Sequence, residues 1–303
     1  MTTFADTFNC RYPIASMAMN KVSDLKLAIA VRKAGALPSL SVFNYFVSQK
    51  EISAKLLQDD LNSYKEQTGD CSILISTGVD QLLDDSLFEV MLNSKVKAIE
   101  LILDTLNENK KTEERFVERD NRIAMLRSNG TLVFVKAIQF DDIIDGIDGL
   151  ALKGPDGAGR GNTQGTTLSE LFDYARSNFP NLKVIVAGGI GTSAQVKEYM
   201  DRGAFGVGIG TLFAACQESK ISHETKLKMV EASASDIKKL TNGAKQNALI
   251  FKELEQDMYN NTRGLMTGIG NPNLGHVFAG TSIEHVTDVK PAEQVVQELV
   301  KDL

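Results

Sequence analysis

The sequence contains few of the side chains that carry out chemistry without a cofactor. Histidine and cysteine each occur three times in 303 residues. The cysteines, Cys10, Cys71 and Cys216, are far apart and show neither metal-ligand spacing nor a disulfide framework, which predicts a reduced compartment. No Ser-His-Asp set, HExxH motif or Cys-His cluster is present. We therefore expect no metal site, and we expect a bound cofactor to supply the reactivity.

Other absences exclude several classes of protein. No apolar run approaches the roughly 20 residues that a membrane-spanning helix requires, and the N-terminus lacks the basic-then-apolar pattern of a secretion signal. A net charge of -6 and a pI near 5.3 argue against nucleic acid or an anionic membrane as a partner. We expect a cytoplasmic protein with a small-molecule substrate, and we leave a homodimer open.

The most informative stretch is residues 183–213, KVIVAGGIGTSAQVKEYMDRGAFGVGIGTLF. Its β-branched run at residues 184–187 predicts a strand buried on both faces. A helix is expected to begin near Thr192 and to end at Gly203, and residues 206–209 predict a second short strand. The stretch therefore reads as strand, helix and strand, the repeating unit of an α/β fold.

Each of these two strands ends in a glycine turn that opens a helix. Gly188 and Gly189 follow the first strand, and Gly210 and Thr211 follow the second. Glycine exposes backbone N–H groups without a Cβ in the way, and a helix N-terminus adds partial positive charge, so a phosphate can bind there. The alternative is that these glycines only make tight turns. Two such turns in tandem, with a threonine, favour a phosphate site.

The remaining apolar runs bring the number of predicted strands to eight. These six further runs are residues 12–17, 36–42, 71–76, 96–103, 131–136 and 148–153, and they precede the two strands described above. This number predicts an α/β fold of the (β/α)8 TIM barrel type, in which the loops after the last two strands commonly bind phosphate. A Rossmann fold is less well supported, because no GxGxxG follows the first strand.

The pattern changes after the eighth strand. Residues 222–259 are rich in Lys, Glu and Ala and predict an almost unbroken helix, and residues 291–303 predict a final amphipathic helix. We therefore expect the barrel to comprise residues 1–216 and 261–303, with residues 217–260 forming a helical insertion beside the barrel mouth.

Active sites of TIM barrels form at the C-terminal ends of the strands. The predicted strands place there Met19, Asn20, Ser76, Asp104, Lys136 and residues 153–165. Lys136 could hold a positive charge against the electron-rich atoms of a cofactor, or could be a solvated edge residue. Residues 154–165 include five glycines, which would let the backbone approach a flat ligand closely; the alternative is a flexible solvent loop.

The three histidines all follow the last predicted barrel strand. His223 and His285 are expected on the surface. His276 lies in a glycine- and asparagine-rich segment, residues 260–280, that is expected to be a loop and could fold over the barrel mouth. Histidine is therefore not expected in the strand-end positions.

Several motifs resemble the FMN-binding barrels of nitronate monooxygenases (2-nitropropane dioxygenase type) and the related FMN-dependent enoyl-acyl-carrier-protein reductases. PIASMAMNKVS, residues 13–23, resembles the first loop of that family, which lies against the flavin ring. AGGIGTS and GIGTLFAACQES, residues 187–193 and 208–219, are similar to its two phosphate turns, and residues 265–300 resemble its tail. Inosine-monophosphate dehydrogenases share the tandem turns, but their catalytic cysteine after strand six is absent from residues 154–165.

The resemblance implies a bound FMN and a set of residues that contact it. On this basis the cofactor site is expected to comprise Ala18, Met19, Asn20, Ser76, Lys136, Gly157, Gly188, Gly189, Gly210 and Thr211. The expected activity is that of an FMN-dependent oxidoreductase of nitronate monooxygenase type. The alternatives are an NAD(P)H-dependent enoyl reductase and a flavin-free barrel that binds a phosphorylated metabolite.

Two departures from the family pattern concern catalysis. The family keeps a histidine, thought to be the catalytic base, in its glycine-rich loop after strand six, where this chain has Arg160. Arginine stays protonated and cannot serve as a base near neutral pH. Leu212 also replaces the usual arginine after Thr211. We expect Arg160 and Lys136 to be catalytic, with Arg160 holding an anionic group; the alternative is that Arg160 pairs with Asp156 or another carboxylate and only fixes the loop.

Overall fold

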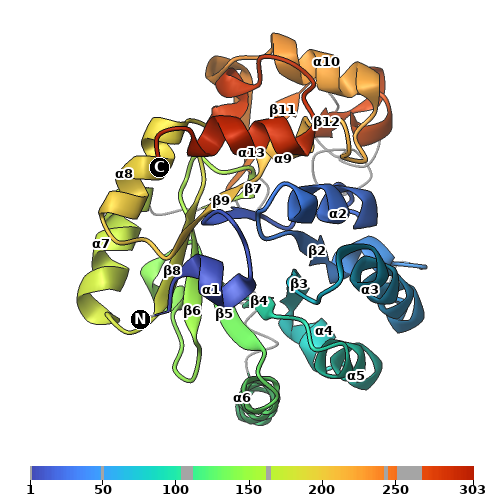
Figure 1. Ribbon diagram of the computed structural model, residues 1–303, viewed down its shortest axis with the longest axis vertical. Coiled ribbons are helices and arrows are strands. Elements are labelled where there is room, and N and C mark those ends of the chain that lie inside the picture. The colour runs from blue at the N-terminus through green and yellow to red at the C-terminus, as the bar shows by residue number, and fades with distance from the viewer. Residues whose placement is uncertain (1, 49–50, 104–111, 162–164, 242–244, 251–267) are drawn as a thin grey trace.

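The computed structural model describes residues 2–48, 51–103, 112–161, 165–241, 245–250 and 268–303. Eight parallel strands form a barrel whose neighbour order is β1-β9-β8-β6-β5-β4-β3-β2 (Figure 1). The strands are β1 (Ile14–Ser16), β2 (Ser39–Ser41), β3 (Leu74–Gly78), β4 (Ala98–Ile102), β5 (Leu132–Ala137), β6 (Gly149–Lys153), β8 (Lys183–Ala187) and β9 (Gly206–Ile209). The predicted (β/α)8 TIM barrel is confirmed.

The barrel closes just before β2. The Ser16 N–H donates to the Leu37 carbonyl oxygen at 2.8 Å, and the Leu37 N–H donates to the Ile14 carbonyl oxygen at 2.9 Å. Residues Ala15 and Leu37 form a parallel bridge at this point. The first strand therefore pairs on both sides, with β9 and with the segment that leads into β2.

Helices cover the outside of the strands (Figure 1). They are α2 (Leu25–Lys33), α3 (Ala54–Thr68), α4 (Val79–Leu82), α5 (Asp85–Asn93), α6 (Glu113–Ser128), α7 (Leu168–Asn178), α8 (Ser193–Asp201), α9 (Thr211–Ala214) and α13 (Ala292–Val300). Helix α8 begins after Thr192, whose hydroxyl oxygen accepts from the Gln195 N–H at 3.2 Å, and Gly203 follows its end at φ +89°. No described helix has the length and apolar character needed to cross a membrane.

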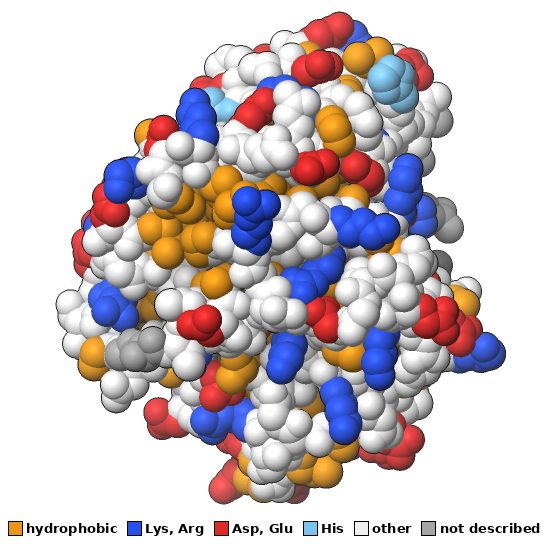
Figure 2. Space-filling view, in the orientation of Figure 1, with side chains coloured by type: hydrophobic (Ala, Val, Ile, Leu, Met, Phe, Trp, Pro, Cys, Tyr) orange, Lys and Arg blue, Asp and Glu red, His pale blue; other side chains and the backbone are white. Residues whose placement is uncertain are grey.

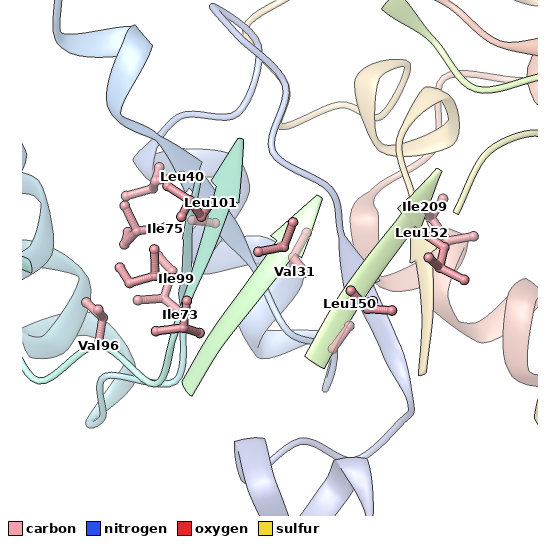
Figure 3. Packing of buried hydrophobic residues seen from close by; sticks show 14 of the residues in the cluster. Val31, Leu40, Ile73, Ile75, Val96, Ile99, Leu101, Leu150, Leu152 and Ile209 are labelled. Carbon is pink, nitrogen blue, oxygen red and sulfur yellow. The ribbon is translucent and has the colours of Figure 1, made fainter. Parts of the chain in front are cut away.

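The period-two alternation of the strands divides the core into two layers. Outward-facing aliphatic side chains pack against the helices; Figure 3 shows Leu40, Ile75 and Leu101 from three neighbouring strands lying together. Inward-facing side chains form a second cluster, which fills the N-terminal part of the barrel. Phe134 from β5 lies in this cluster with Phe8, whose short helix α1 (Phe4–Phe8) closes that end.

One helix was missing from the sequence prediction. No element was assigned to residues 166–182, yet α7 covers much of this segment. Thr167 caps α7 by accepting from the Glu170 N–H at 3.2 Å, and the Glu170 carboxylate accepts from the Thr167 N–H at 2.7 Å. This reciprocal pair has the Thr-x-x-Glu spacing of a capping box, so the helix start was visible in the sequence.

The expected helix over residues 222–259 is wrong for much of its length. It begins as α10 (His223–Glu231), but β10 (Ile237–Thr241) and β11 (Lys245–Ile250) then form an antiparallel hairpin. In the sequence, an Asn-Gly dipeptide at positions 242 and 243 is a hairpin signal, which the helix prediction did not take into account. Residues 251–259 lie outside the described part of the chain.

The hairpin belongs to a second, smaller sheet. Strand β11 also pairs antiparallel with β7 (Gly159–Arg160) and with β12 (His276–Val277). In Figure 1 this sheet lies above β8 and β9, beside α10. Two segments predicted as loops, residues 154–165 and 260–280, therefore each contribute a short strand to it.

The surface carries mixed charge on the face seen in Figure 2. Acidic and basic side chains are interspersed there, without a large area of one sign. Such a face offers no extended basic surface for a nucleic-acid backbone.

Candidate active site

A group of adjoining cavities lies at the C-terminal ends of the barrel strands. The largest, of about 230 Å³, is lined by residues from β3, β5, β6 and β7, including Ser76, Lys136 and Arg160. A second shares Ala18, Lys136 and Lys153 with it, and a third shares Ala18 with both. The residues predicted from the sequence to bind FMN or to act in catalysis all line these cavities: Ala18, Met19, Asn20, Ser76, Lys136, Gly157, Arg160, Gly188, Gly189, Gly210 and Thr211.

The second cavity has a wall of glycines in which two loops approach closely. Gly188 and Gly189 have φ values of +104° and +79°, a region that favours glycine. A Cβ on Gly188 would lie 2.9 Å from the Gly154 backbone nitrogen, and one on Gly157 would lie 3.1 Å from the Gly188 Cα. Here the contact between the loops after β6 and β8 requires glycine.

The turn after β9 is more open. A Cβ on Gly210 would have no heavy atom within 4 Å in the described part of the chain, although the residue lines the second cavity. The Thr211 hydroxyl oxygen is fixed, because it accepts from the Gly280 N–H at 3.0 Å. The two turns therefore form an uncharged wall of glycine backbone beside an open space.

The same alternation that fills the barrel with apolar side chains directs three charged ones inward near the mouth. Lys136 lies two residues after Phe134 on β5, and Glu100 lies two residues after Ala98 on β4. The Lys136 Nζ and Glu100 Oε1 atoms are 2.6 Å apart, and the Ser76 hydroxyl donates to the same Oε1 at 3.0 Å. The Glu100 side chain is 0% exposed, and its Oε2 has no hydrogen-bond partner among the described residues.

The burial of Lys136 argues against one of its two interpretations. Its side chain is only 18% exposed and lines the first and second cavities, so Lys136 is not a solvated edge residue. Glu100 was not recognised from the sequence. The signal was present, since Glu100 is the one acidic residue inside the apolar run of residues 96–103, at an inward-facing position.

The third charged side chain is Lys153, at the end of β6. Its Nζ donates to the carbonyl oxygen of Ala158 and to that of Arg160, the latter at 2.5 Å, so the amine spans the loop that leads into β7. Burial lowers the pKa of Lys153 to about 7, with a further contribution from the positive charges of Lys136 and Arg160. Lys153 lines the first and second cavities; the sequence places it at a strand end without a role.

Arg160 shares the largest cavity with a buried carboxylate, Asp142. The Asp142 Oδ2 accepts from the N–H groups of Ile138 at 2.8 Å and Gln139 at 3.2 Å, whereas Oδ1 has no partner within the described ranges. Burial raises the pKa of Asp142, while the two N–H groups and the charge of Arg160 oppose that rise. Asp142 was also missed, because the sequence leaves room for a helical turn before β6 but does not show that the turn Phe140–Asp142 carries this carboxylate inward.

The three histidines do not line the cavities. His276 is 1% exposed in β12, burial lowers its pKa, and it is not among the residues that line the three cavities. His223 is exposed at the start of α10, and His285 lies beside Glu284 at 3.4 Å. Asp104 lies outside the described residues. Within those residues, no group of three or more His, Cys, Asp or Glu side chains could hold a metal ion.

Comparison with known families identifies the relationship. The sequence model for nitronate monooxygenase matches residues 42–302. The chain belongs to the nitronate monooxygenase family. This confirms the resemblance found in the sequence, and it makes the chain an oxidoreductase of a flavin-dependent class. A search of curated protein sequences gave no match.

Solved structures share the fold over nearly the whole chain. FabK from Thermotoga maritima is 22% identical with a TM-score of 0.80, covering 99% of this chain and 96% of that one. A nitroalkane oxidase from Streptomyces ansochromogenes is 19% identical with a TM-score of 0.76, covering 100% and 98%. The enoyl reductase domain of MlnA from Bacillus amyloliquefaciens is 11% identical with a TM-score of 0.72, covering 98% and 95%. At these identities the likeness establishes the barrel.

Proposed function

We propose that this chain is an FMN-dependent oxidoreductase that acts on nitronates. The chain belongs to the nitronate monooxygenase family. The observation that supports the proposal is that two cavities of different character adjoin at the barrel mouth. One has glycine walls and the other has a cationic wall with Arg160, and they share Ala18, Lys136 and Lys153. A single elongated ligand with a phosphate at one end, together with a small anionic substrate, fits this arrangement.

The residues present fit a flavin mononucleotide. Gly188, Gly189 and Gly210 offer backbone N–H groups for the phosphate, and the absence of Cβ atoms leaves room for it. The ring would lie beside residues 18–20 and Lys136, where the cavities meet. When bound, the flavin supplies the electron transfer that no side chain of this site can perform.

The role proposed for Arg160 is to hold the negative charge of the substrate. Its guanidinium is a fork of donors that matches the two oxygens of a nitronate, and it lines the largest cavity. Pairing of its backbone with Gln246 in the second sheet fixes the residue that carries it. A nitronate is already an anion, so a guanidinium can bind it without first acting as a base.

A second candidate function is the NAD(P)H-dependent reduction of an activated C=C bond. It is favoured by the apolar part of the largest cavity, which is lined by Phe43, Ile102, Leu103, Ile138 and Phe278. Such a wall suits a hydrocarbon chain better than it suits a small nitronate.

The absorbance spectrum of the purified protein tests the cofactor. We expect a yellow protein with bound FMN. A colourless protein that takes up no FMN, and that is stabilised against heat by a sugar phosphate, would instead support a flavin-free barrel. Anaerobic stopped-flow measurements then separate the two reactions, because ethyl nitronate should bleach the flavin of a nitronate oxidant and NADPH that of a reductase.

Replacement of Arg160 by methionine tests the anion site. Charge-assisted hydrogen bonds of this kind contribute about 1.5–3 kcal/mol, so we expect KM for ethyl nitronate to rise about 10- to 100-fold with flavin content intact. Arg11→Met, an exposed arginine beside Tyr12, is the matched control and should leave KM unchanged. An unchanged KM in Arg160→Met, with lower thermal stability alone, would mean that Arg160 only fixes the loop.

A further inference from the structure

Two lysines lie near the C-terminal ends of neighbouring strands at the mouth, but their surroundings differ. Lys136 is paired with the Glu100 carboxylate at 2.6 Å. Lys153 has no Asp or Glu oxygen within 4 Å of its Nζ in the part of the chain that the structure describes; its partners are two backbone carbonyl oxygens. Lys136 therefore has a carboxylate counter-ion, whereas Lys153 has only uncharged hydrogen-bond partners, so Lys153 is the lysine that can exist as a neutral amine.

We propose that Lys153 is a proton-transfer residue of this site, which removes the α-proton of a neutral nitroalkane and thereby extends the substrate range from nitronates to nitroalkanes. This inference rests on the proposed function, since it concerns the conjugate acid of the same substrate. In this proposal Arg160 binds charge and moves no proton.

The hydrogen bonds of Lys153 suit this role. A neutral amine has two N–H donors and one lone pair in a tetrahedral arrangement. The carbonyl oxygens of Ala158 and Arg160 can take both donors, which leaves the fourth position for a proton that is gained or lost. Lys153 lines the first and second cavities, so this position adjoins the space that a flavin and a substrate would share.

The electrostatic surroundings support the neutral form at working pH. Burial and the charges of Lys136 and Arg160 hold the pKa of Lys153 near 7, where a general base is most effective. No histidine lines the cavities among the described residues, so the lysine has no competitor of that type.

The proton transfer is balanced without a further reactant. The Cα–H bond of the nitroalkane breaks and its electron pair moves onto the nitro group, while the proton forms a new N–H bond on Lys153. A neutral amine and a neutral nitroalkane thus become an ammonium ion and a nitronate. The nitronate oxygens form in the cavity that Arg160 lines, where its positive charge stabilises them.

Asp142 is the other group in the cavity able to accept a proton. Its Oδ1 has no partner within the described ranges, so it could act as a base on the same substrate. Two features favour Lys153. Asp142 lines only the largest of the three cavities, and a carboxylate would repel the nitronate that it generates.

The experiment compares nitroethane with ethyl nitronate in holoenzyme variants. Lys153→Arg keeps donors for both carbonyls but cannot lose a proton near neutral pH, and Lys153→Met removes the amine. For both we expect kcat/KM for nitroethane to fall at least about 100-fold relative to kcat/KM for ethyl nitronate. Lys183→Met, a lysine at the opposite end of the neighbouring strand β8, is the control and should match wild type on both substrates.

A second readout does not depend on turnover. In protein labelled with ¹³C at the lysine Cε, one resonance should titrate near pH 7 in wild type and be absent from Lys153→Met. In wild type, kcat/KM for nitroethane should rise through the same pH, and this rise should disappear in Lys153→Arg. These results together would support the proposal.

Three results would overturn it. They are wild-type turnover of ethyl nitronate but not of nitroethane, Lys153 variants that keep nitroethane turnover with an unchanged pH profile, and loss of that turnover in Asp142→Asn alone. A wild-type protein that binds FMN but does not oxidise ethyl nitronate would refute the proposed function instead, and the inference would fall with it.

Discussion

The two ends of the barrel interior differ in chemistry although the same strands build them. At the N-terminal end, inward positions hold Ala98, Phe134 and Ala151, packed against the phenylalanines of α1. Two residues further along the same three strands stand Glu100, Lys136 and Lys153. One step of the strand repeat therefore separates a packed apolar plug from a charged, hollow mouth. The apolar layer contributes mainly to stability, and the charged layer contains the groups able to do chemistry. Substitutions in the two layers should therefore have different effects.

The apolar layer should show the largest effect on stability. Phe8 is 0% exposed, and Phe8→Ala should lower the free energy of unfolding by about 3–5 kcal/mol through the cavity it leaves. Urea denaturation measures this, and FMN affinity of the folded variant should be unchanged. Phe116→Ala, at a residue 40% exposed on α6, should cost less than about 1 kcal/mol. Equal losses in the two variants would mean that α1 does not seal the barrel.

In the charged layer, Glu100→Met should cost about 3 kcal/mol, because it leaves the Lys136 ammonium without its partner. The double variant Glu100→Met with Lys136→Met removes both charges and should recover most of that loss in the same denaturation experiment. If the single variant is within about 0.5 kcal/mol of wild type, water in the cavity already screens the pair.

At the glycine wall, Gly188→Ala combines a left-handed backbone with a contact of 2.9 Å to the Gly154 nitrogen. Gly69→Ala is its matched control, since Gly69 has φ +83° but nothing within 4 Å of the added Cβ in the described chain. We expect about 1–2 kcal/mol of destabilisation for Gly69→Ala from the backbone alone, and about 2 kcal/mol more, with loss of FMN, for Gly188→Ala. Similar losses in both would show that the loops can separate at small cost.

Lys153 should make stability depend on pH. Its pKa is about 7 in the folded chain against 10.5 as the ordinary value, so between these pH values the unfolded chain binds a proton that the folded chain does not. Wild-type stability should therefore rise with pH in that window, by up to about 1.4 kcal/mol per pH unit. The Tm advantage of Lys153→Met over wild type should be largest at pH 6 and smaller at pH 9. An advantage that grows with pH would contradict this linkage.

The parts of the molecule that were predictable are those set by local pattern. The β-branched runs and the glycines at 188, 189 and 210 depend on backbone conformation within a few residues, and they led to the barrel and to the cavity residues. The roles of Glu100 and Asp142 could not be predicted, because they depend on strands and turns that bring Lys136 and Arg160 close to them in space. Their placement depends on register between strands, which local propensity does not contain.

The helix prediction for residues 237–250 was wrong for a related reason. Its lysines, alanines and glutamines favour a helix in isolation, but pairing with β7 and β12 adds backbone hydrogen bonds that only a strand can make. Those partners lie in two segments that had been interpreted as loops, so the prediction had no sheet for the hairpin to join. The missed α7 differs, because its capping box was readable locally.

The pairing of Arg160 with Gln246 also affects the order of folding. Strands β8 and β9 with their helices lie between these two residues in the chain, so the pair can form only after a long loop closes. The apolar cluster inside the barrel can form before the hairpin does. The strand β7, which carries Arg160, can pair only after β11 has been formed. In a full chain whose barrel strands have paired but whose hairpin has not, the mouth is incomplete, and a ligand that binds only the complete mouth would shift the equilibrium toward it.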